Sequence, residues 1–450
     1  MKQKIFSLFM LLMLVAATSF AQETGIYNLT EAGTLKDIPN ISTVTHLTLT
    51  GFIDARDTKF MRDNMPALAN LDLSNATIMA YEGDKGTLYD EWISYPANEI
   101  PTNAFYFADT QTGKTSLKNI EFPASLPAIA TNAFRNTGLT EIYLPSDLIA
   151  IGDSAFMACF NLTWLDLPNQ LLAIGDYAFA YCYDLEGDLE LPLSLFELGK
   201  SAFYDCYKIS GDIIISPQIT EIKDGVFFNC FELTSVTFAT HSAYSGIHSI
   251  GDHSFFSCEK ITNIEIPSTV TSIGKNAFAA SGLSSNMIIP NSVSFIGSNA
   301  FAYTDLDTVF CQSGVPAVLG YYYNEETDSY YYGAFDDEIT IIVPCGVLNV
   351  YQNADIWRDY ENMYENCPSA TQKVSSDLSI TPYPNPAQDR IFIQSDIMVK
   401  RVEIYSLTGK LLISEDNFIE KISISALSQG VYLLKIYTDK GLVVRKIEKD

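Results

Sequence analysis

A short phrase that ends in Ala-Phe or Ser-Phe recurs along most of this chain. Its clear copies occupy residues 151–156, 174–179, 198–203, 250–255, 273–278 and 296–301. Looser copies end at Phe105, Phe134, Phe227 and Phe335, and successive phenylalanines are 22 to 34 residues apart, most often 22 to 24. A period near 23 predicts a solenoid, in which each unit buries its apolar face only by stacking on its neighbours.

Each repeat also contains a run of alternating apolar and polar residues that ends in proline, as in residues 139–145, 162–168 and 261–267. The alternation predicts a strand with one buried face, and the proline ends it because proline cannot donate to a ladder. An Ile-Gly turn follows, often with an aspartate next to it. We expect Asp153, Asp176, Asp224 and Asp252 to cap one helical turn that carries the Ala-Phe pair.

Five of the eight cysteines lie three residues after a repeat phenylalanine: Cys159, Cys182, Cys206, Cys230 and Cys258. Coils spaced by roughly 4.8 Å would stack these thiols into a ladder. A bridge between two of them is the alternative, but five cannot all pair, and other coils place alanine, serine or threonine in this position. We therefore expect small buried core side chains. For Cys311, Cys345 and Cys367 the sequence leaves two pairings open, Cys311–Cys345 and Cys345–Cys367.

The phrases Ile-Gly-x-x-Ala-Phe-x-x-Cys and Leu-x-x-Ile-x-Ile-Pro together resemble the BspA-like leucine-rich repeats of bacteria. The resemblance covers residues 95–344. Residues 22–94 are interpreted as atypical N-terminal repeats that cap the solenoid, and residues 345–368 as a C-terminal cap. The resemblance implies a leucine-rich-repeat solenoid and a role in adhesion at a cell surface.

The first 21 residues combine a basic start, a short apolar run and small residues before Gln22, which predicts a secretory signal peptide cut after Ala21. No second hydrophobic run has the length of a membrane span. The acidic excess lies on residues 22–376, with 44 acidic and 15 basic side chains, whereas residues 377–450 have ten of each. Such a body repels nucleic acid and anionic membranes and favours basic partners or divalent cations, although it also serves solubility.

A polar linker, residues 369–378, precedes a region with a different pattern. Short alternating segments at residues 390–394, 400–406, 410–414, 421–425, 430–437 and 442–447 predict a small all-β, Ig-like sandwich over residues 379–450. The tail resembles the type A C-terminal sorting domain of the type IX secretion system. The resemblance rests on Pro384, Asn385, Pro386, Gly409, Gly430 and Tyr432 within their motifs, and it implies recognition by the secretion machinery and an extracellular location, either surface-bound or released.

The sequence shows no catalytic motif, phosphate loop or metal-ligand spacing, so we expect a non-catalytic protein without cofactor or metal. Three of the four histidines, His241, His248 and His253, lie within 13 residues, but their spacing favours loop histidines over a metal site.

Two insertions in the repeats are the candidate binding sites. Two tyrosine triplets in residues 320–335 predict a hairpin whose exposed rings contact an extracellular protein or a glycan: Tyr321, Tyr322, Tyr323, Tyr330, Tyr331 and Tyr332. A hairpin packed on the cap is the alternative. The insertion at residues 81–98 offers Trp92 together with Tyr89 and Tyr95. We expect a protein-binding repeat face, with glycan binding through these aromatic residues as the second hypothesis.

Overall fold

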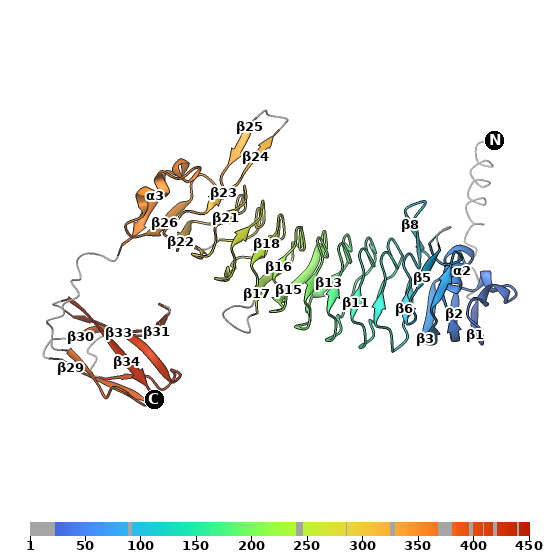
Figure 1. Ribbon diagram of the computed structural model, residues 1–450, viewed down its shortest axis with the longest axis horizontal. Coiled ribbons are helices and arrows are strands. Elements are labelled where there is room, and N and C mark those ends of the chain that lie inside the picture. The colour runs from blue at the N-terminus through green and yellow to red at the C-terminus, as the bar shows by residue number, and fades with distance from the viewer. Residues whose placement is uncertain are drawn as a thin grey trace, which may run out of the picture. The chain divides into compact units, whose positions relative to one another are not determined.

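The computed structural model describes residues 23–88, 92–239, 246–284, 286–324, 329–367, 380–395, 399–407, 409–416, 421–438 and 441–450. It forms two compact units, Met1–Asn366 and Cys367–Asp450 (Figure 1). Each unit is described here by itself.

The first unit begins with a parallel sheet. Strands β1 (Thr24–Leu29), β2 (His46–Ile53), β3 (Asn70–Ile78) and β9 (Asn119–Glu121) pair in that order. Helix α2 (Ala55–Asn64) leaves β2 through a capping box made by Asp54 and Asp57. The short 3-10 turns η1 (Leu35–Asp37) and η2 (Ile41–Thr43) connect β1 to β2. Leucine and isoleucine side chains of these elements are continuous with the core of the coils that follow.

The coils stack through two-residue parallel strands that end in the isoleucine or leucine of the Ile-Gly phrase. One sheet contains β6 (Glu99–Ile100), β10 (Ala128–Ile129), β11 (Ala150–Ile151), β12 (Ala173–Ile174) and β14 (Glu197–Leu198). A second contains β16 (Glu221–Ile222), β18 (Ser249–Ile250), β19 (Ser272–Ile273), β21 (Phe295–Ile296) and β23 (Val318–Leu319). The repeated phrase, expected to be a turn, is therefore partly a β-ladder.

Glycine follows seven of these ten strands, and there the backbone of the preceding coil is close to the position of a Cβ. A Cβ added at Gly199 would lie 2.2 Å from the carbonyl carbon of Gly175. The ladder is interrupted between β14 and β16, and Lys223 occupies the glycine position in the coil of β16. A Cβ at this position does not by itself interrupt the ladder, because Ala130 follows β10, which pairs with both β6 and β11.

The proline-ended runs form the other stacked face. Its strands are β13 (Glu186–Asp188), β15 (Lys208–Ile215), β17 (Leu233–Phe238), β20 (Met287–Ile289), β22 (Thr308–Cys311), β26 (Thr340–Pro344) and β27 (Met363–Asn366). Between β9 and β13 two coils contribute only isolated parallel bridges, Glu121 with Tyr143 and Glu141 with Trp164. The predicted alternation is confirmed even there, because Ile142 and Leu165 are buried whereas Tyr143 and Trp164 are exposed.

The expected N-cap role of the repeat aspartates is wrong. Residues 153–158 form consecutive turns and not a helical segment. Asp153 accepts a hydrogen bond from the backbone N–H of Asp176 in the next coil at 2.8 Å, and Asp176 accepts one from Lys200 at 2.7 Å. Asp224 and Asp252 bond to the next coil in the same way. The carboxylates therefore join coils, because the nearest unpaired N–H belongs to the neighbour and not to a local helix.

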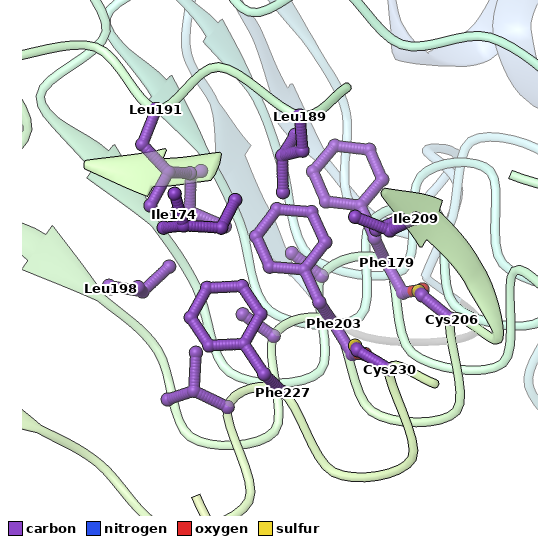
Figure 2. Close-up of a cluster of buried hydrophobic side chains, with 14 of the residues drawn as sticks. Ile174, Phe179, Leu189, Leu191, Leu198, Phe203, Cys206, Ile209, Phe227 and Cys230 are labelled. Atoms are coloured by element: carbon purple, nitrogen blue, oxygen red, sulfur yellow. The ribbon is translucent and has the colours of Figure 1, made fainter. Parts of the chain in front are cut away.

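The repeat phenylalanines form one continuous stack inside the coils. Ten rings from Phe105 to Phe335 follow one another with centroid separations of 5.2 to 5.7 Å. Figure 2 shows Phe179, Phe203 and Phe227 in a row, flanked by apolar side chains from the two strand faces. All ten belong to one core that runs from Leu29 to Met363, so the predicted shared interior of the solenoid is confirmed.

The five ladder cysteines are free and buried, as predicted. Each thiol donates to the carbonyl oxygen of the phenylalanine one coil earlier, at 3.1 to 3.3 Å between sulfur and oxygen. Burial raises the pKa of the Cys159 thiol to about 12. The same cause raises the pKa of the other four thiols, so all five are neutral thiol donors.

A compact cap closes the last coil. Helix α3 (Leu348–Gln352) and the 3-10 turn η3 (Trp357–Asp359) bury Tyr351, Trp357 and Tyr360. The indole Nε1 of Trp357 donates to the carbonyl oxygen of Ala317 at 2.7 Å. Of the two pairings left open for the remaining cysteines, Cys311–Cys345 is excluded because Cys311 is free, and Cys345 and Cys367 are the two disulfide-bonded cysteines.

The second unit contains two antiparallel sheets. One orders β28 (Ile380–Tyr383), β29 (Arg390–Ser395) and β32 (Lys421–Ser423), and the other orders β31 (Leu411–Asp416), β30 (Val399–Ser406), β33 (Gly430–Thr438) and β34 (Gly441–Lys449). Ile391, Ile404, Leu434 and other apolar side chains of both sheets share one buried cluster. All six strands expected from the sequence are present, and β28 is an additional strand.

Candidate binding surfaces

The predicted tyrosine hairpin is present as the antiparallel pair β24 (Tyr321–Asn324) and β25 (Ser329–Tyr332). Figure 1 shows the pair extending away from the coil that contains β23. The Tyr321 side chain is 63 % exposed. The side chains of Tyr322, Tyr323, Tyr330, Tyr331 and Tyr332 lie outside the described residues, so their role stays a prediction.

The earlier insertion presents one aromatic ring to solvent. Strand β4 (Tyr81–Gly83) pairs with β5 (Ile93–Tyr95), and Trp92 just before β5 is 73 % exposed. Its Nε1 donates to the Glu82 carboxylate at 3.4 Å. Tyr95 is buried, and its hydroxyl accepts a hydrogen bond from the backbone N–H of Leu88. Tyr89 lies outside the described residues, so within the described part of this insertion Trp92 is the candidate contact residue.

A larger aromatic surface follows the turn edge of the coils and was not predicted. One row of rings comes from the residue after each of the first four ladder cysteines: Phe160, Tyr183, Tyr207 and Phe231. Their ring centroids are 5.3, 5.0 and 5.2 Å apart, and the ring planes differ by 7 to 20°. All four are at least partly exposed. We call this row the first aromatic ladder.

A second aromatic ladder lies beside the first and consists of Tyr181, Tyr204, Phe228 and Phe256. Tyr204 and Phe228 stack at 4.4 Å, and Phe228 and Phe256 at 4.9 Å. Tyr181 meets Tyr204 edge-on at 5.5 Å and also contacts Tyr183 of the first ladder at 6.3 Å. Eight rings thus form one patch over neighbouring coils. Because most of them stack face to face, they present mainly ring edges and hydroxyl groups to solvent.

The ladder tyrosines are neutral hydrogen-bond donors. Burial, reinforced by the Asp205 carboxylate, raises the pKa of Tyr207 to about 12. The same two causes raise the pKa of Tyr181, Tyr183 and Tyr204. A partner that covers this patch would therefore meet apolar ring edges with fixed polar tips, which is the composition of many protein interfaces.

Two more exposed rings lie on the strand face, among carboxylates. Tyr143 is 68 % and Trp164 49 % exposed. The bridges place Tyr143 beside Glu121 and Trp164 beside Glu141, and the Tyr143 hydroxyl donates to the Glu141 carboxylate at 3.2 Å. The Trp164 ring lies over Gly187, where an added Cβ would be 3.5 Å from its Cζ3 atom. Glycine at 187 thus leaves space for the indole to lie against the next coil.

The ladders could have been found from the sequence. Aligning the repeats on the phenylalanine places Tyr204, Phe228 and Phe256 in one column, and aligning on the cysteine places the first ladder in another. Columns of a stacked repeat become neighbours at the coil spacing, so an aromatic column predicts a row of rings. The cysteine column was interpreted in this way, but the columns next to it were not.

The three described histidines form no metal-ligand cluster. His253 is half-buried and pairs with Asn276 at 2.9 Å, and burial lowers its pKa. His46 contacts Thr45 and Asn70, His248 is exposed, and His241 lies outside the described residues. Among the described residues the one cluster with metal-ligand spacing is Cys345, Glu365 and Cys367. Both of its thiols are in disulfide linkage, so they are not thiolate ligands there.

The tail motif residues hold the second unit together. The Asn385 side chain donates to the Lys446 carbonyl at 3.0 Å and accepts from the Glu448 N–H at 2.7 Å, and the bonds before Pro384 and Pro386 are cis. Gly409 has a φ of 88°, which suits glycine in the turn between β30 and β31. The Tyr432 hydroxyl donates to the Ser428 carbonyl at 2.7 Å. Gly430 begins β33.

The stacked coils with a ladder of core phenylalanines define a leucine-rich-repeat solenoid protein. The family described as "BspA type Leucine rich repeat region" matches in six copies over residues 98–234 and 197–329. The chain belongs to this BspA-type leucine-rich-repeat family. Residues 381–449 match "Secretion system C-terminal sorting domain", and this tail is a type IX sorting domain.

Several solved bacterial leucine-rich-repeat proteins are similar to the chain. The Treponema protein TpLRR is 28 % identical, with 37 % of this chain and 72 % of that one covered and a TM-score of 0.31. A Bacteroides ovatus protein is 18 % identical, with 72 % and 84 % covered and a TM-score of 0.39. The pneumococcal vaccine antigen PcpA is 17 % identical, with 72 % and 78 % covered and a TM-score of 0.32.

No curated protein matches the chain. Within the described residues, no helix has both the length and the apolar character that a membrane span requires. The sorting domain indicates a protein that is secreted through the type IX machinery.

Proposed function

We propose that this protein is a non-catalytic, adhesin-like binding protein that presents a rigid repeat surface to an extracellular protein. The observation that carries the proposal is the pair of aromatic ladders, eight partly exposed rings on adjacent coils. Contiguous apolar surface of this kind is uncommon on monomers and marks interaction sites. Aromatic side chains also supply most of the binding free energy in many protein interfaces.

The coil stack supports this role because it holds the rings in fixed positions. Each ladder residue is adjacent in sequence, or nearly so, to a core phenylalanine or cysteine that is fully buried. A surface that is already ordered loses little conformational entropy when a partner binds. The acidic excess of the repeat body argues against nucleic acid and anionic membranes as partners.

Glycan binding is the second candidate, and a different set of rings favours it. Sugars stack on open aromatic faces, and most ladder faces are covered by the next ring. Trp92 and Tyr321 are exposed single rings, and with Tyr322, Tyr323, Tyr330, Tyr331 and Tyr332 they are the proposed glycan contacts. We also propose how the protein is exported. A signal peptide over residues 1–21 directs it out of the cytoplasm, and the secretion machinery recognises the Ig-like tail. The repeats then stay at the cell surface or are released.

Cross-linking of the exported protein in its natural surroundings tests the proposal. We expect a protein partner whose cross-linked peptides map to the turn edge of residues 156–258. The double variant Tyr183→Ser with Tyr207→Ser should lose this partner. Tyr303→Ser is the matched control, because Tyr303 occupies the same repeat position as Tyr181, is 73 % exposed and lies two coils beyond Phe256.

A partner retained by the double variant would refute the ladder interface. Glycan-array binding that disappears in Trp92→Ala or Tyr321→Ala, with no protein partner captured, would instead establish the second candidate. Thermal unfolding of each variant shows whether the scaffold is intact, so a loss of binding can be separated from a loss of folding.

A further inference from the structure

The strand face contains a second surface with a distinct chemistry. We define the acidic strand patch as Glu121, Glu141, Tyr143, Trp164, Asp166 and Glu186. All six side chains are exposed, and they alternate along their strands with the buried positions of Ile142 and Leu165. The patch therefore points away from the core, on consecutive coils that are joined by parallel bridges.

Three carboxylates of the patch, those of Glu121, Glu141 and Asp166, form no ion pair with the described residues, whereas Glu186 has a basic neighbour. Elsewhere on the coils, acidic side chains pair with lysines: Asp184 with Lys208 at 2.7 Å, Asp224 with Lys200 at 3.4 Å and Glu197 with Lys223 at 3.2 Å. The basic neighbour of Glu186 is Lys208, its register partner on β15, which also pairs with Asp184. Many other acidic side chains of the coils, such as Asp147, Glu190 and Glu265, also form no ion pair among the residues that the structure describes, so what distinguishes Glu121, Glu141 and Asp166 is the two exposed rings beside them.

The two rings of the patch also lack a cation of this chain. Elsewhere the protein places arginines over tyrosines, Arg56 over Tyr81 and Arg135 over Tyr106, each at 4.9 Å from the ring centroid. In the described part of the chain, no basic side chain lies over the Tyr143 or Trp164 ring; Lys208 lines the same surface hollow as Trp164, but it pairs with Asp184. The inner side of Trp164 faces Gly187, and about half of the side chain is open to solvent.

We propose that the acidic strand patch binds an arginine side chain of a basic protein segment, with the guanidinium over Trp164 and hydrogen-bonded to the Glu141 and Asp166 carboxylates. Arginine combines the features that the patch complements: a permanent charge, a planar group that stacks on aromatic rings and a fork of N–H donors for carboxylates. Charge complementarity selects the basic class, because the whole repeat body repels anionic partners.

A divalent cation is a weaker match for the patch. Calcium requires six to eight oxygen ligands converging on one point, whereas these carboxylates lie on separate coils around two aromatic rings that supply no ligand. An extended segment suits the site better, because alternate residues of a strand point to the same side and two arginines could reach Trp164 and Tyr143. This inference rests on the proposed binding role and specifies the chemistry of one contact surface.

The test uses the full chain and a short labelled peptide of alternating arginine and serine. Its neutral counterpart has citrulline in place of arginine. We expect the arginine peptide to bind, and to bind more weakly at higher salt. Trp164→Leu, which keeps an apolar contact with Gly187 but removes the π face, should weaken binding about two- to five-fold.

Glu141→Gln combined with Asp166→Asn should weaken binding to a similar or greater extent. The matched control is Tyr364→Leu, an exposed tyrosine on strand β27 of the other end of the same face. It should leave the affinity unchanged, because Tyr364 lies outside the patch and its replacement keeps every charge of the protein.

Equal affinity of Trp164→Leu and the unaltered protein would overturn the inference, as would equal binding of the citrulline peptide. Calcium that binds the patch and is unaffected by Trp164→Leu would also overturn it. The two proposals fail separately. If cross-linking captures no protein but the arginine peptide binds through Trp164, the proposed function fails and the site stands. If a protein partner is captured equally by Trp164→Leu, the site fails and the function stands.

Discussion

The stack of core phenylalanines makes a direct prediction about Phe203→Ala. Phe203 is fully buried, and its ring lies 5.4 Å from Phe179 and 5.7 Å from Phe227. Truncation to alanine removes both ring contacts and leaves a cavity inside a continuous core. Ala202 and Cys206 flank this position and are fully buried as well, so the coil has little freedom to collapse into the space.

The expected loss is about 3–5 kcal/mol in the free energy of unfolding, the range for phenylalanine truncation in a packed core. In a solenoid this loss is concentrated in the two interfaces that Phe203 shares with its neighbours, because stability is the sum of repeat and nearest-neighbour terms. Whole domains are stable by about 5–15 kcal/mol. The substitution should therefore uncouple the coils before residue 203 from those after it.

Denaturant unfolding with two probes measures both effects. Trp164 lies before the substitution and Trp357 after it, and hydrogen exchange resolves the same two halves peptide by peptide. We expect the variant to unfold in two phases, with exchange fastest around residues 198–230. Tyr303→Ala is the control: its side chain is 73 % exposed, so the change should stay within about 0.5 kcal/mol.

A single unchanged transition, or a loss of less than about 1 kcal/mol, would refute this reasoning. Such a result would mean that the rings contribute little beyond filling space and that the coils do not depend on one another through this stack. Faster exchange confined to one coil, with both halves still unfolding together, would retain the packing argument but refute the uncoupling.

Two further predictions concern the ladders that join the coils. Gly199→Ala should lower the free energy of unfolding by about 1–3 kcal/mol, because the added Cβ would overlap the Gly175 backbone. Lys223→Ala, at the same position of the next coil, is the control and should have a much smaller effect. Thermal unfolding of both variants measures the difference. Rising pH should destabilise the fold from about pH 8.5 upward, where unfolded thiols ionise. Burial raises the pKa of Cys159 to about 12 and also raises the pKa of the other ladder thiols, so up to that pH the unfolded state releases protons that the folded state keeps. Each thiol lowers the free energy of unfolding by about 1.4 kcal/mol per pH unit above its unfolded pKa. A variant with alanine at all five positions should show a shallower dependence of unfolding free energy on pH. An equal dependence in the variant would contradict the assignment.

The sequence was sufficient to predict the solenoid because the core is built from repeated residues. Phe105 and Phe335 are 230 positions apart, yet the period alone places them in one stack, and both are buried there. The strands of the tail could be predicted for a different reason. Their alternation and turn residues are local signals, so no information from the rest of the chain was needed.

The error over the aspartates shows where local reasoning fails. Capping rules treat Asp153 as part of its own segment, and they hold when the nearest unpaired N–H belongs to that segment. In the stacked coils, the Asp153 carboxylate instead accepts from the backbone N–H of Asp176, which lies 23 residues later in the sequence but in the adjacent coil. The pairing follows from the spacing of the coils, which the sequence implied but which the capping argument did not use.

The candidate surfaces were only partly predictable. The tyrosine hairpin and Trp92 were found because they interrupt the repeat, and an interruption is visible in a single repeat. The ladders and the acidic strand patch consist of ordinary repeat positions. Tyr207 or Trp164 alone is an unremarkable exposed aromatic residue. They become candidate contact residues because stacking of the coils places Tyr183 and Phe231 beside Tyr207, and Glu141 beside Trp164.

The combination of carboxylates and exposed rings on the strand face supports the proposed arginine site. Coils stack at about 4.8 Å, well within the Debye length of about 8 Å at physiological ionic strength, so acidic columns repel along the stack. At Asp184 and Glu197 the repulsion is offset by lysines of the next coil. On the strand face, Glu121, Glu141 and Asp166 repel one another in the same way, and no described basic side chain forms an ion pair with them. Unpaired carboxylates alone are explained by solubility, since many others lie elsewhere on the coils. The exposed rings of Tyr143 and Trp164 among them are not, because a solubilising surface gains nothing from exposed aromatic rings, whereas a surface that binds arginine uses both groups.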